Sequence, residues 1–187
     1  IRRFLVHILR RGLSGQYQHN LARAIRAFLN YCVRDALLES SPFAHVQMPR
    51  LERKVPEALS AHEFNAILRS CDCARDRAIC LFLLDSGVRA SELLALNLGD
   101  VDLKTGAVTV RLGKGQKGRT TYVGAATRKQ LRRYYTERTT TRDDDPVFIA
   151  EKGRGRLTQG GLVQLMERLR KRSGVALCTC HTFRRTF

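Results

Sequence analysis

A charged stretch bracketed by prolines divides this chain and most limits how it can fold. In "MPRLERKVPEALS", Pro49 and Pro56 enclose charged residues, and proline cannot continue a helix or sit within a central strand. Directly afterwards, Ser60 and Glu63 have the spacing of a helix capping box. The sequence therefore predicts a helical domain, a linker and a second domain, with bounds at residues 1–48, 49–59 and 60–187.

Hydrophobic spacing indicates helices on both sides of this linker. In residues 16–37 the apolar side chains recur every three or four positions, which is the period of one helix face. Residues 74–87 are rich in apolar side chains and end in glycine, which is typical of a buried helix and its C-terminal cap. Further helices are predicted within residues 1–15, 89–97, 125–138 and 158–172, and from Ser60 and near His181 onward.

One segment follows the period of a strand instead. In residues 106–124, Val108 and Val110 alternate with polar neighbours, as do Thr121 and Val123 after a glycine-rich turn. This pattern predicts a β-hairpin. The expected fold class is therefore mainly α with a small antiparallel β-sheet (α+β).

The charge indicates a partner lined with phosphates. Lys and Arg number 34 against 17 Asp and Glu, a formal net charge of +17, and the excess lies on both sides of a near-neutral middle. A polyanion such as nucleic acid is the simplest reason for a chain to carry such self-repulsion. The alternative is a basic protein without such a partner. No apolar run approaches the roughly 18 residues that a membrane helix needs, so we expect no membrane association.

The six cysteines favour reduced thiols over disulfides, because the chain shows no secretion signal. Cys32 and Cys80 fall on apolar helix faces and are expected in the core. The pairs Cys71/Cys73 and Cys178/Cys180 have one intervening residue, not the two to four that are usual in zinc sites. A structural metal stays open only as a weak alternative.

A helix break in the apolar middle of the chain carries a cation. Arg89 follows Gly87 there, and a cation at such a junction needs an anionic partner. An ion pair with Glu92 or Asp100 is the simplest interpretation.

Two further motifs gather basic side chains. The hairpin tip "GKGQKGR" carries Lys114, Lys117 and Arg119 among glycines that let the backbone approach a ligand, although a solvated turn is the common alternative. It is not a Walker loop, because no Lys-Ser/Thr follows the glycines into a helix. His181 and Arg184 are three residues apart and therefore share a helix face.

In this order the motifs resemble one family. The segments "SGVRASELLAL", "DVDLKTGAVTVRLGKGQKGR" and "HTFRRTF" closely resemble the tyrosine recombinases, also called phage integrases. Residues 1–48 resemble the later helices of that family's core-binding domain, so the resemblance spans nearly the whole chain. It implies a site-specific recombinase or integrase that breaks and rejoins DNA through a 3′-phosphotyrosyl intermediate, with no metal and no cofactor.

The resemblance also implies roles for single residues. Arg89 and Arg184 are the paired arginines that grip the scissile phosphate, and their planar guanidinium groups suit its oxygens. Lys114 is the hairpin lysine that protonates the leaving 5′ oxygen, with Lys117 as its rival. His181 is a general base or proton relay. Glu92 supports the setting of the arginine, and DNA contacts are expected from Arg23, Arg26, Lys117 and Arg119.

The sequence departs from the family pattern after the last motif. The family has a second His or Trp and a nucleophilic tyrosine beyond this point, and none of the five tyrosines here matches that position. We therefore expect this chain to bind DNA but not to cleave it. Arg185 stands where the family often has histidine, next to the motif and not within it.

The implied partners are double-stranded DNA with inverted-repeat recombination sites and, for the full-length protein, three further copies in a homo-tetramer on DNA. A cytoplasmic, nucleoid-associated location in a prokaryote follows from this interpretation. The alternatives are a non-catalytic DNA-binding relative that regulates recombination sites, a type IB topoisomerase, and a zinc-binding structural protein that rests only on the cysteine pairs.

Overall fold

A computed structural model describes residues 1–48, 57–111, 118–138, 142–151 and 155–187. The chain divides into two compact units, Ile1–Val55 and Pro56–Phe187. Most of the predicted linker lies outside the described residues, so the linker prediction stays untested.

The first unit is a pair of helices, α1 (Arg2–Arg10) and α2 (Gly15–Arg34). The side chain of Ser14 accepts a hydrogen bond from the Tyr17 N–H and so caps α2. The helix ends at Arg34, three residues before the predicted end, and Ala36 follows in the left-handed conformation with φ of 56°. Among the described side chains of this unit, the buried apolar ones are Ile8, Ala22, Cys32 and Phe43.

The second unit is mostly helical with one two-stranded antiparallel sheet, which confirms the predicted fold class. Its elements in chain order are α3 (Ala61–Arg69), α4 (Ala74–Ser86), α5 (Ala90–Ala95), a 3₁₀ turn (Leu98–Asp100), β1 (Ala107–Val110), β2 (Arg119–Tyr122), α6 (Ala125–Thr136), α7 (Gln159–Ser173) and α8 (Cys180–Thr186).

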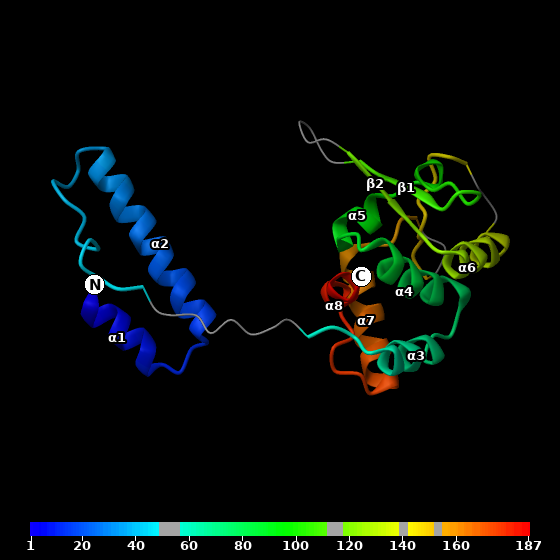
Figure 1. Ribbon diagram of the computed structural model, residues 1–187, viewed down its shortest axis with the longest axis horizontal. Coiled ribbons are helices and arrows are strands. Elements are labelled where there is room, and N and C mark those ends of the chain that lie inside the picture. Colours follow the sequence, from blue (N-terminus) through cyan, green and yellow to red (C-terminus); the bar gives the residue numbers. More distant parts are fainter. Residues whose placement is uncertain (49–56, 112–117, 139–141, 152–154) are drawn as a thin grey trace. The chain divides into compact units, whose positions relative to one another are not determined.

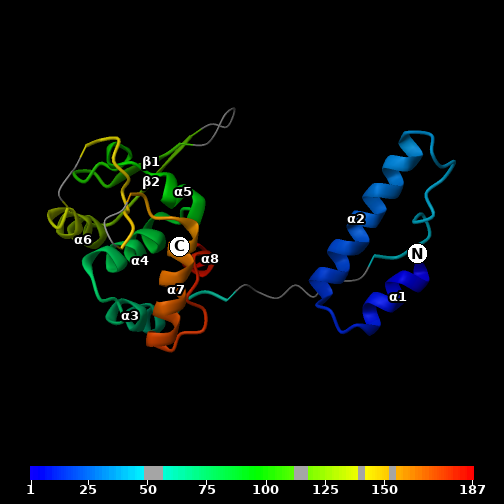
Figure 2. The same ribbon diagram turned by 180° about the vertical axis from the view of Figure 1, so that it is seen from behind.

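Helix α4 is the centre of this unit. Figure 1 and Figure 2 show it between α6 on one side and α8 on the other, and it packs against both. Its apolar side chains on several faces are fully buried, as expected of a helix covered all round: Ile79, Cys80, Phe82 and Leu83. The helix ends at Gly87 in the left-handed conformation, with φ of 56°, as the sequence predicts.

The hairpin is confirmed, with Val108 opposite Thr121 and Val110 opposite Arg119. The two valines are buried while Thr120 and Tyr122 are exposed, so the sheet has one buried and one solvated face. Lys114 and Lys117, at the tip, lie outside the described residues. The Thr121 hydroxyl donates to the Ser86 carbonyl at 3.0 Å, which ties the sheet to the end of α4.

The capping box at the start of α3 is confirmed. The Ser60 hydroxyl accepts from the Glu63 N–H, and the Glu63 carboxylate accepts from the Ser60 N–H. One residue earlier, the Leu59 N–H donates to the Thr186 hydroxyl at 2.9 Å. The beginning of this unit is therefore held against α8, although the two lie at opposite ends of its sequence.

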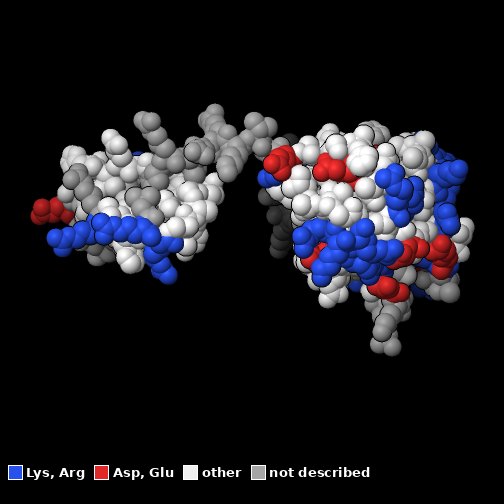
Figure 3. Space-filling model, turned by 90° about the horizontal axis from the view of Figure 1, so that it is seen from below, with Lys and Arg blue, Asp and Glu red and all other residues white. Residues whose placement is uncertain are grey.

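Basic side chains gather on the face of the second unit that Figure 3 views from below, with a smaller group of acidic side chains beside them. The last turn of α7 carries Arg170, Lys171 and Arg172. Arg170 pairs with Glu167 and Arg172 pairs with Asp72, so part of this positive charge is balanced. Within the described ranges, no helix has the length and apolar character to cross a membrane.

Candidate functional site

The site forms where α4 gives way to α5. Gly87 turns the chain in the left-handed conformation, and Arg89 then occupies the N-cap position of α5. Its side chain leaves the helix break and is 60% exposed. The sequence predicts a cation at this junction. In the structure, one side of the Arg89 guanidinium faces solvent and the other binds a carboxylate.

That carboxylate is Glu92, one turn into α5 and only 7% exposed. It accepts the backbone N–H of Arg89 at 2.7 Å and one side-chain bond from Arg89 Nη1 at 2.9 Å. Arg119, the first residue of β2, donates from Nη1 and Nη2 to its two oxygens at 2.8 and 2.7 Å. These bonds, chiefly those from Arg119, lower the pKa of Glu92 to about 2 and keep it ionised.

The predicted ion pair of Arg89 is therefore the one with Glu92. Asp100, the other partner considered, pairs instead with Arg111, whose Nε lies 2.7 Å from its Oδ1. The backbone N–H of Asn97 donates to the second oxygen of Asp100 at 2.9 Å. Glu92 and Asp100 thus each pair with an arginine from the segment predicted as the hairpin, residues 106–124.

Helix α8 brings Arg184 to the same junction. Its guanidinium donates to the carbonyl of Gly87, two residues before Arg89. The ring of Phe187 covers Gly87 so closely that a β-carbon there would lie 2.5 Å from it. Arg184 and Arg119 line one open pocket of about 300 Å³ together with Ser86, Gly87, Thr120, Thr121 and Phe187.

The structure places the other predicted site residues in three ways. His181 is exposed in the first turn of α8, one turn before Arg184. Lys114 and Lys117 lie outside the described residues. Arg23 and Arg26 are exposed on α2 of the first unit.

The pocket has the electrostatics of an anion site. Arg119 and Arg184 line it, and the Arg184 guanidinium donates to the Gly87 carbonyl. Beside it, Arg89 and Arg119 both bind the carboxylate of Glu92. Planar guanidinium groups with N–H donors to spare match the oxygens of a phosphodiester. In the described part of the chain, no cluster of three or more His, Cys, Asp or Glu side chains is placed to hold a metal ion. All six thiols are free, and Cys32 and Cys80 are buried as predicted.

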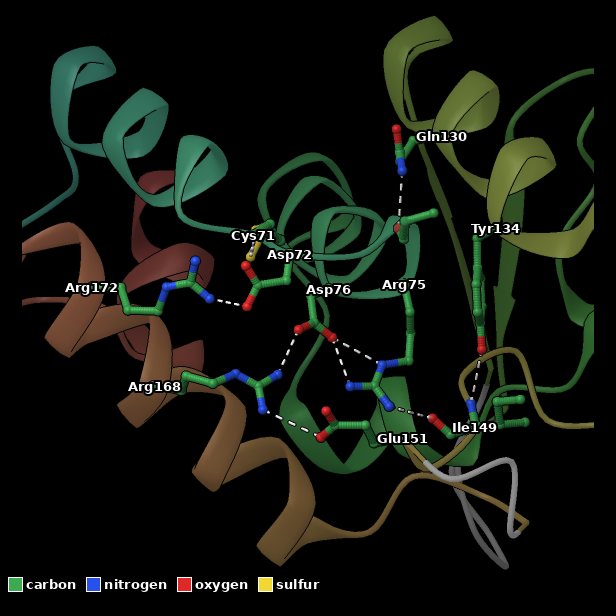
Figure 4. A network of polar contacts seen from close by, with 12 residues as sticks. Cys71, Asp72, Arg75, Asp76, Gln130, Tyr134, Ile149, Glu151, Arg168 and Arg172 are labelled. Atoms are coloured by element: carbon green, nitrogen blue, oxygen red, sulfur yellow. Dashed lines mark hydrogen bonds and ion pairs between the residues drawn. The ribbon is translucent and has the colours of Figure 1, made fainter. Parts of the chain in front are cut away.

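Sequence reasoning missed a second arginine–carboxylate cluster, shown in Figure 4. Asp76 in the first turn of α4 is buried, and it accepts hydrogen bonds from Arg75 and from Arg168 of α7. The cluster lines the larger cavity of about 460 Å³ that also carries Asp72, Glu137 and Glu151. An acidic residue in the first turn of an apolar helix was the available signal, but it also fits simple helix-dipole compensation.

The family follows from the sequence match to this same unit. Residues 57–187 match the model of the phage integrase family. The chain belongs to the phage integrase family. The matched range includes the helix break at Arg89, the strands of the hairpin and α8.

Individual relatives agree with this assignment. A tyrosine recombinase XerD of Halalkalibacterium halodurans is 29% identical over 194 residues, covering 98% of this chain and 64% of its own length. A tyrosine recombinase XerC of Pseudomonas syringae pv. tomato is 36% identical over 154 residues, covering 78% of this chain and 51% of its own. The chain thus spans about half to two thirds of the length of these phage integrase relatives.

Solved structures show the same fold. The XerA recombinase crystal structure superimposes with a TM-score of 0.64 at 26% identity, covering all of this chain and 65% of its own. The Tn1549 transposon integrase, solved in complex with circular intermediate DNA, gives a TM-score of 0.77 at 19% identity, covering 99% and 69%. The mainly helical fold with a small sheet is therefore that of phage integrase structures.

Proposed function

We propose that the protein to which this chain belongs is a site-specific DNA recombinase that breaks and rejoins DNA through a 3′-phosphotyrosyl intermediate. Membership of the phage integrase family and the DNA complex of the Tn1549 integrase support a DNA substrate. The observation that carries the proposal is the hydrogen bond from Arg184 to the Gly87 carbonyl. This bond lies two residues before Arg89, which is paired with Glu92. Two cations from distant segments thereby meet at one helix break.

In this mechanism Arg89 and Arg184 bind the non-bridging oxygens of the scissile phosphate, where negative charge grows during transfer. His181, one turn before Arg184, serves as general base or proton relay. Lys114, with Lys117 as the alternative, protonates the leaving 5′ oxygen. The arginines do the electrostatic work that a metal ion does in other phosphoryl-transfer enzymes.

The partner is double-stranded DNA with inverted-repeat recombination sites, bound by a homo-tetramer of the full-length protein. Arg23 and Arg26 on the exposed side of α2 contribute contacts to the DNA backbone. A location in the bacterial cytoplasm with the nucleoid follows from such a substrate.

The 187-residue chain tests the binding half of this proposal. Its affinity for a labelled duplex carrying an inverted repeat is measured at several salt concentrations. The logarithm of the binding constant should fall linearly with the logarithm of salt concentration, by about 0.9 for each phosphate neutralised. A flat response would contradict the phosphate-clamp mechanism.

The chemical half has its own test. None of the five tyrosines of this chain stands after Arg184, where the family's nucleophile lies. Incubation of the 187-residue chain with nicked duplex substrate should give no covalent protein–DNA adduct on a denaturing gel. An adduct that survives denaturation would show that one of the five tyrosines is the nucleophile after all.

A further inference from the structure

We infer that Arg119 is a positioning residue, which acts through Glu92 to leave Arg89 free for the phosphate and does not itself bind DNA. The inference rests on the proposed function and deepens it. It differs from the sequence-based expectation that Arg119 contacts DNA directly.

The bonds of Arg119 are the first observation. Both of its terminal nitrogens point at Glu92, one at each carboxylate oxygen, at 2.8 and 2.7 Å. This is the bidentate arrangement that arginine makes best with a carboxylate. The side chain lines the phosphate pocket but is only 36% exposed, and its charge is directed at a residue that is 7% exposed.

The contrast with Arg89 is the second observation. Arg89 gives one side-chain nitrogen to Glu92, at 2.9 Å, and stays 60% exposed. Its remaining N–H donors are therefore available to an anion at the helix break. The two arginines therefore share Glu92 unequally. Arg119 gives it both terminal nitrogens, whereas the Arg89 side chain gives it only one.

The unequal sharing has a physical consequence. A carboxylate has about four acceptor positions, and a buried one is costly unless they are used. Arg119 fills two of them, and Arg89 fills the other two with its backbone N–H and Nη1. Without Arg119, Glu92 would draw both terminal nitrogens of Arg89, and that arginine would lose donors that the phosphate needs.

The sheet fixes Arg119 for this role. It is the first residue of β2 and pairs with Val110 of β1, which is buried. The neighbouring Thr121 is bonded to the Ser86 carbonyl at the end of α4. Strand β2 is thus bonded to both helices that flank the helix break, to α4 through Thr121 and to α5 through the ion pair of Arg119 with Glu92.

A double-mutant cycle tests the inference. DNA affinity is measured for the 187-residue chain with Arg119→Gln, Glu92→Gln and both changes, and thermal unfolding verifies that each variant is folded. We expect Arg119→Gln to weaken binding by about tenfold in the wild-type background and by less than about twofold when Glu92 is already glutamine. Equal losses in both backgrounds, with the salt slope reduced by about 1 each time, would mean direct phosphate contact and would overturn the inference.

Arg119→Lys is the second variant. Lysine keeps the charge but cannot make the paired bonds to a carboxylate, so we expect it to lose affinity almost as glutamine does. Retained affinity would indicate a simple phosphate contact. Arg168→Gln is the matched control, because Arg168 also pairs with a buried carboxylate in this unit but lies away from the pocket; it should leave affinity unchanged.

A readout without DNA separates this inference from the proposed function. The side-chain NMR signal of Arg89 should shift in Arg119→Gln and stay in place in Arg168→Gln. An unmoved Arg89 signal in Arg119→Gln would overturn the positioning role, whatever the DNA result. A shifted signal in a protein that binds DNA without salt dependence would support the coupling and reject the phosphate clamp instead.

Discussion

Two buried carboxylates in the second unit, Glu92 and Asp76, are each held between two arginines, yet only the Glu92 cluster contributes an arginine, Arg119, to the basic pocket. Glu92 joins Arg89 and Arg119. Asp76 accepts two bonds from Arg75, at 2.9 and 2.8 Å, and one from Arg168, at 2.6 Å. The charge types and distances are nearly the same.

The two clusters differ in how many N–H donors of their arginines remain unpaired. Arg75 is 8% exposed and gives its remaining terminal nitrogen to the Ile149 carbonyl. Arg168 also pairs with Glu151. Figure 4 shows that these bonds link α4, α7 and the segment around Ile149. The hydrogen bonds of Arg75 and Arg168 therefore join elements of the fold to one another.

Charge separates the two cavities as well. The larger cavity beside Asp76 holds four acidic and three basic side chains, whereas the described residues that line the smaller pocket include two arginines, Arg119 and Arg184, and no acidic side chain. A phosphate would meet repulsion in the larger cavity and attraction in the smaller one. The larger cavity is therefore not the better anion site. The better site is the one with unpaired N–H donors and a positive net charge.

The largest expected effect breaks the Asp76 side of the comparison. Asp76→Ala leaves two arginines, one of them buried, without their carboxylate and should lower the unfolding free energy by about 3–5 kcal/mol. Urea unfolding measures it. The fraction that remains folded should bind DNA with wild-type affinity, and weakened binding by folded protein would place Asp76 in the functional site.

Acid unfolding sharpens the Glu92 side. The pKa of Glu92 falls from its ordinary 4.5 to about 2 on folding, so its contribution to stability is complete above pH 4.5 and is lost as pH falls toward 2. Because its arginine partners are partly exposed, we set this contribution at about 2 kcal/mol. Glu92→Gln should be less stable than wild type at pH 7 and converge with it near pH 2. A constant difference across that range would contradict the lowered pKa.

Arg184→Gln tests the pocket itself. Loss of one phosphate-binding guanidinium should weaken duplex binding by about tenfold, which corresponds to about 1.4 kcal/mol, and reduce the salt slope by about 1. Fluorescence anisotropy at several salt concentrations measures both quantities. The inference of a functional difference between the clusters fails if Arg168→Gln has the same effect on binding.

The smallest effect compares two helix-ending glycines. Gly87 and Gly174 both have positive φ, 56° and 71°, so alanine at either should cost about 1 kcal/mol of stability. A β-carbon at Gly174 meets open space, whereas one at Gly87 meets the Phe187 ring beside the Arg184 contact. Calorimetry should give a stability loss for Gly87→Ala at least as large as that for Gly174→Ala, and only Gly87→Ala should weaken DNA binding. Equal binding by both variants would show that the seat of Arg184 tolerates displacement of α8.

The sequence by itself determined the local elements and the identity of the central cations. The capping box at Ser60, the glycine end of α4 and the alternation around Val108 all act over a few residues, so local chemistry predicts them. Arg89 and Arg184 were chosen from their motifs, and the structure sets both at one helix break.

Only the tertiary structure decided which charge meets which. Arg119 reaches Glu92 across 27 residues, Arg168 reaches Asp76 across 92, and Arg184 reaches the Gly87 carbonyl across 97. These pairings depend on how β2, α7 and α8 pack around α4, and no short-range pattern encodes that packing. The sequence identifies each cation. Whether that cation pairs with a buried carboxylate or can bind a phosphate depends on which of its N–H donors remain unpaired after the elements pack.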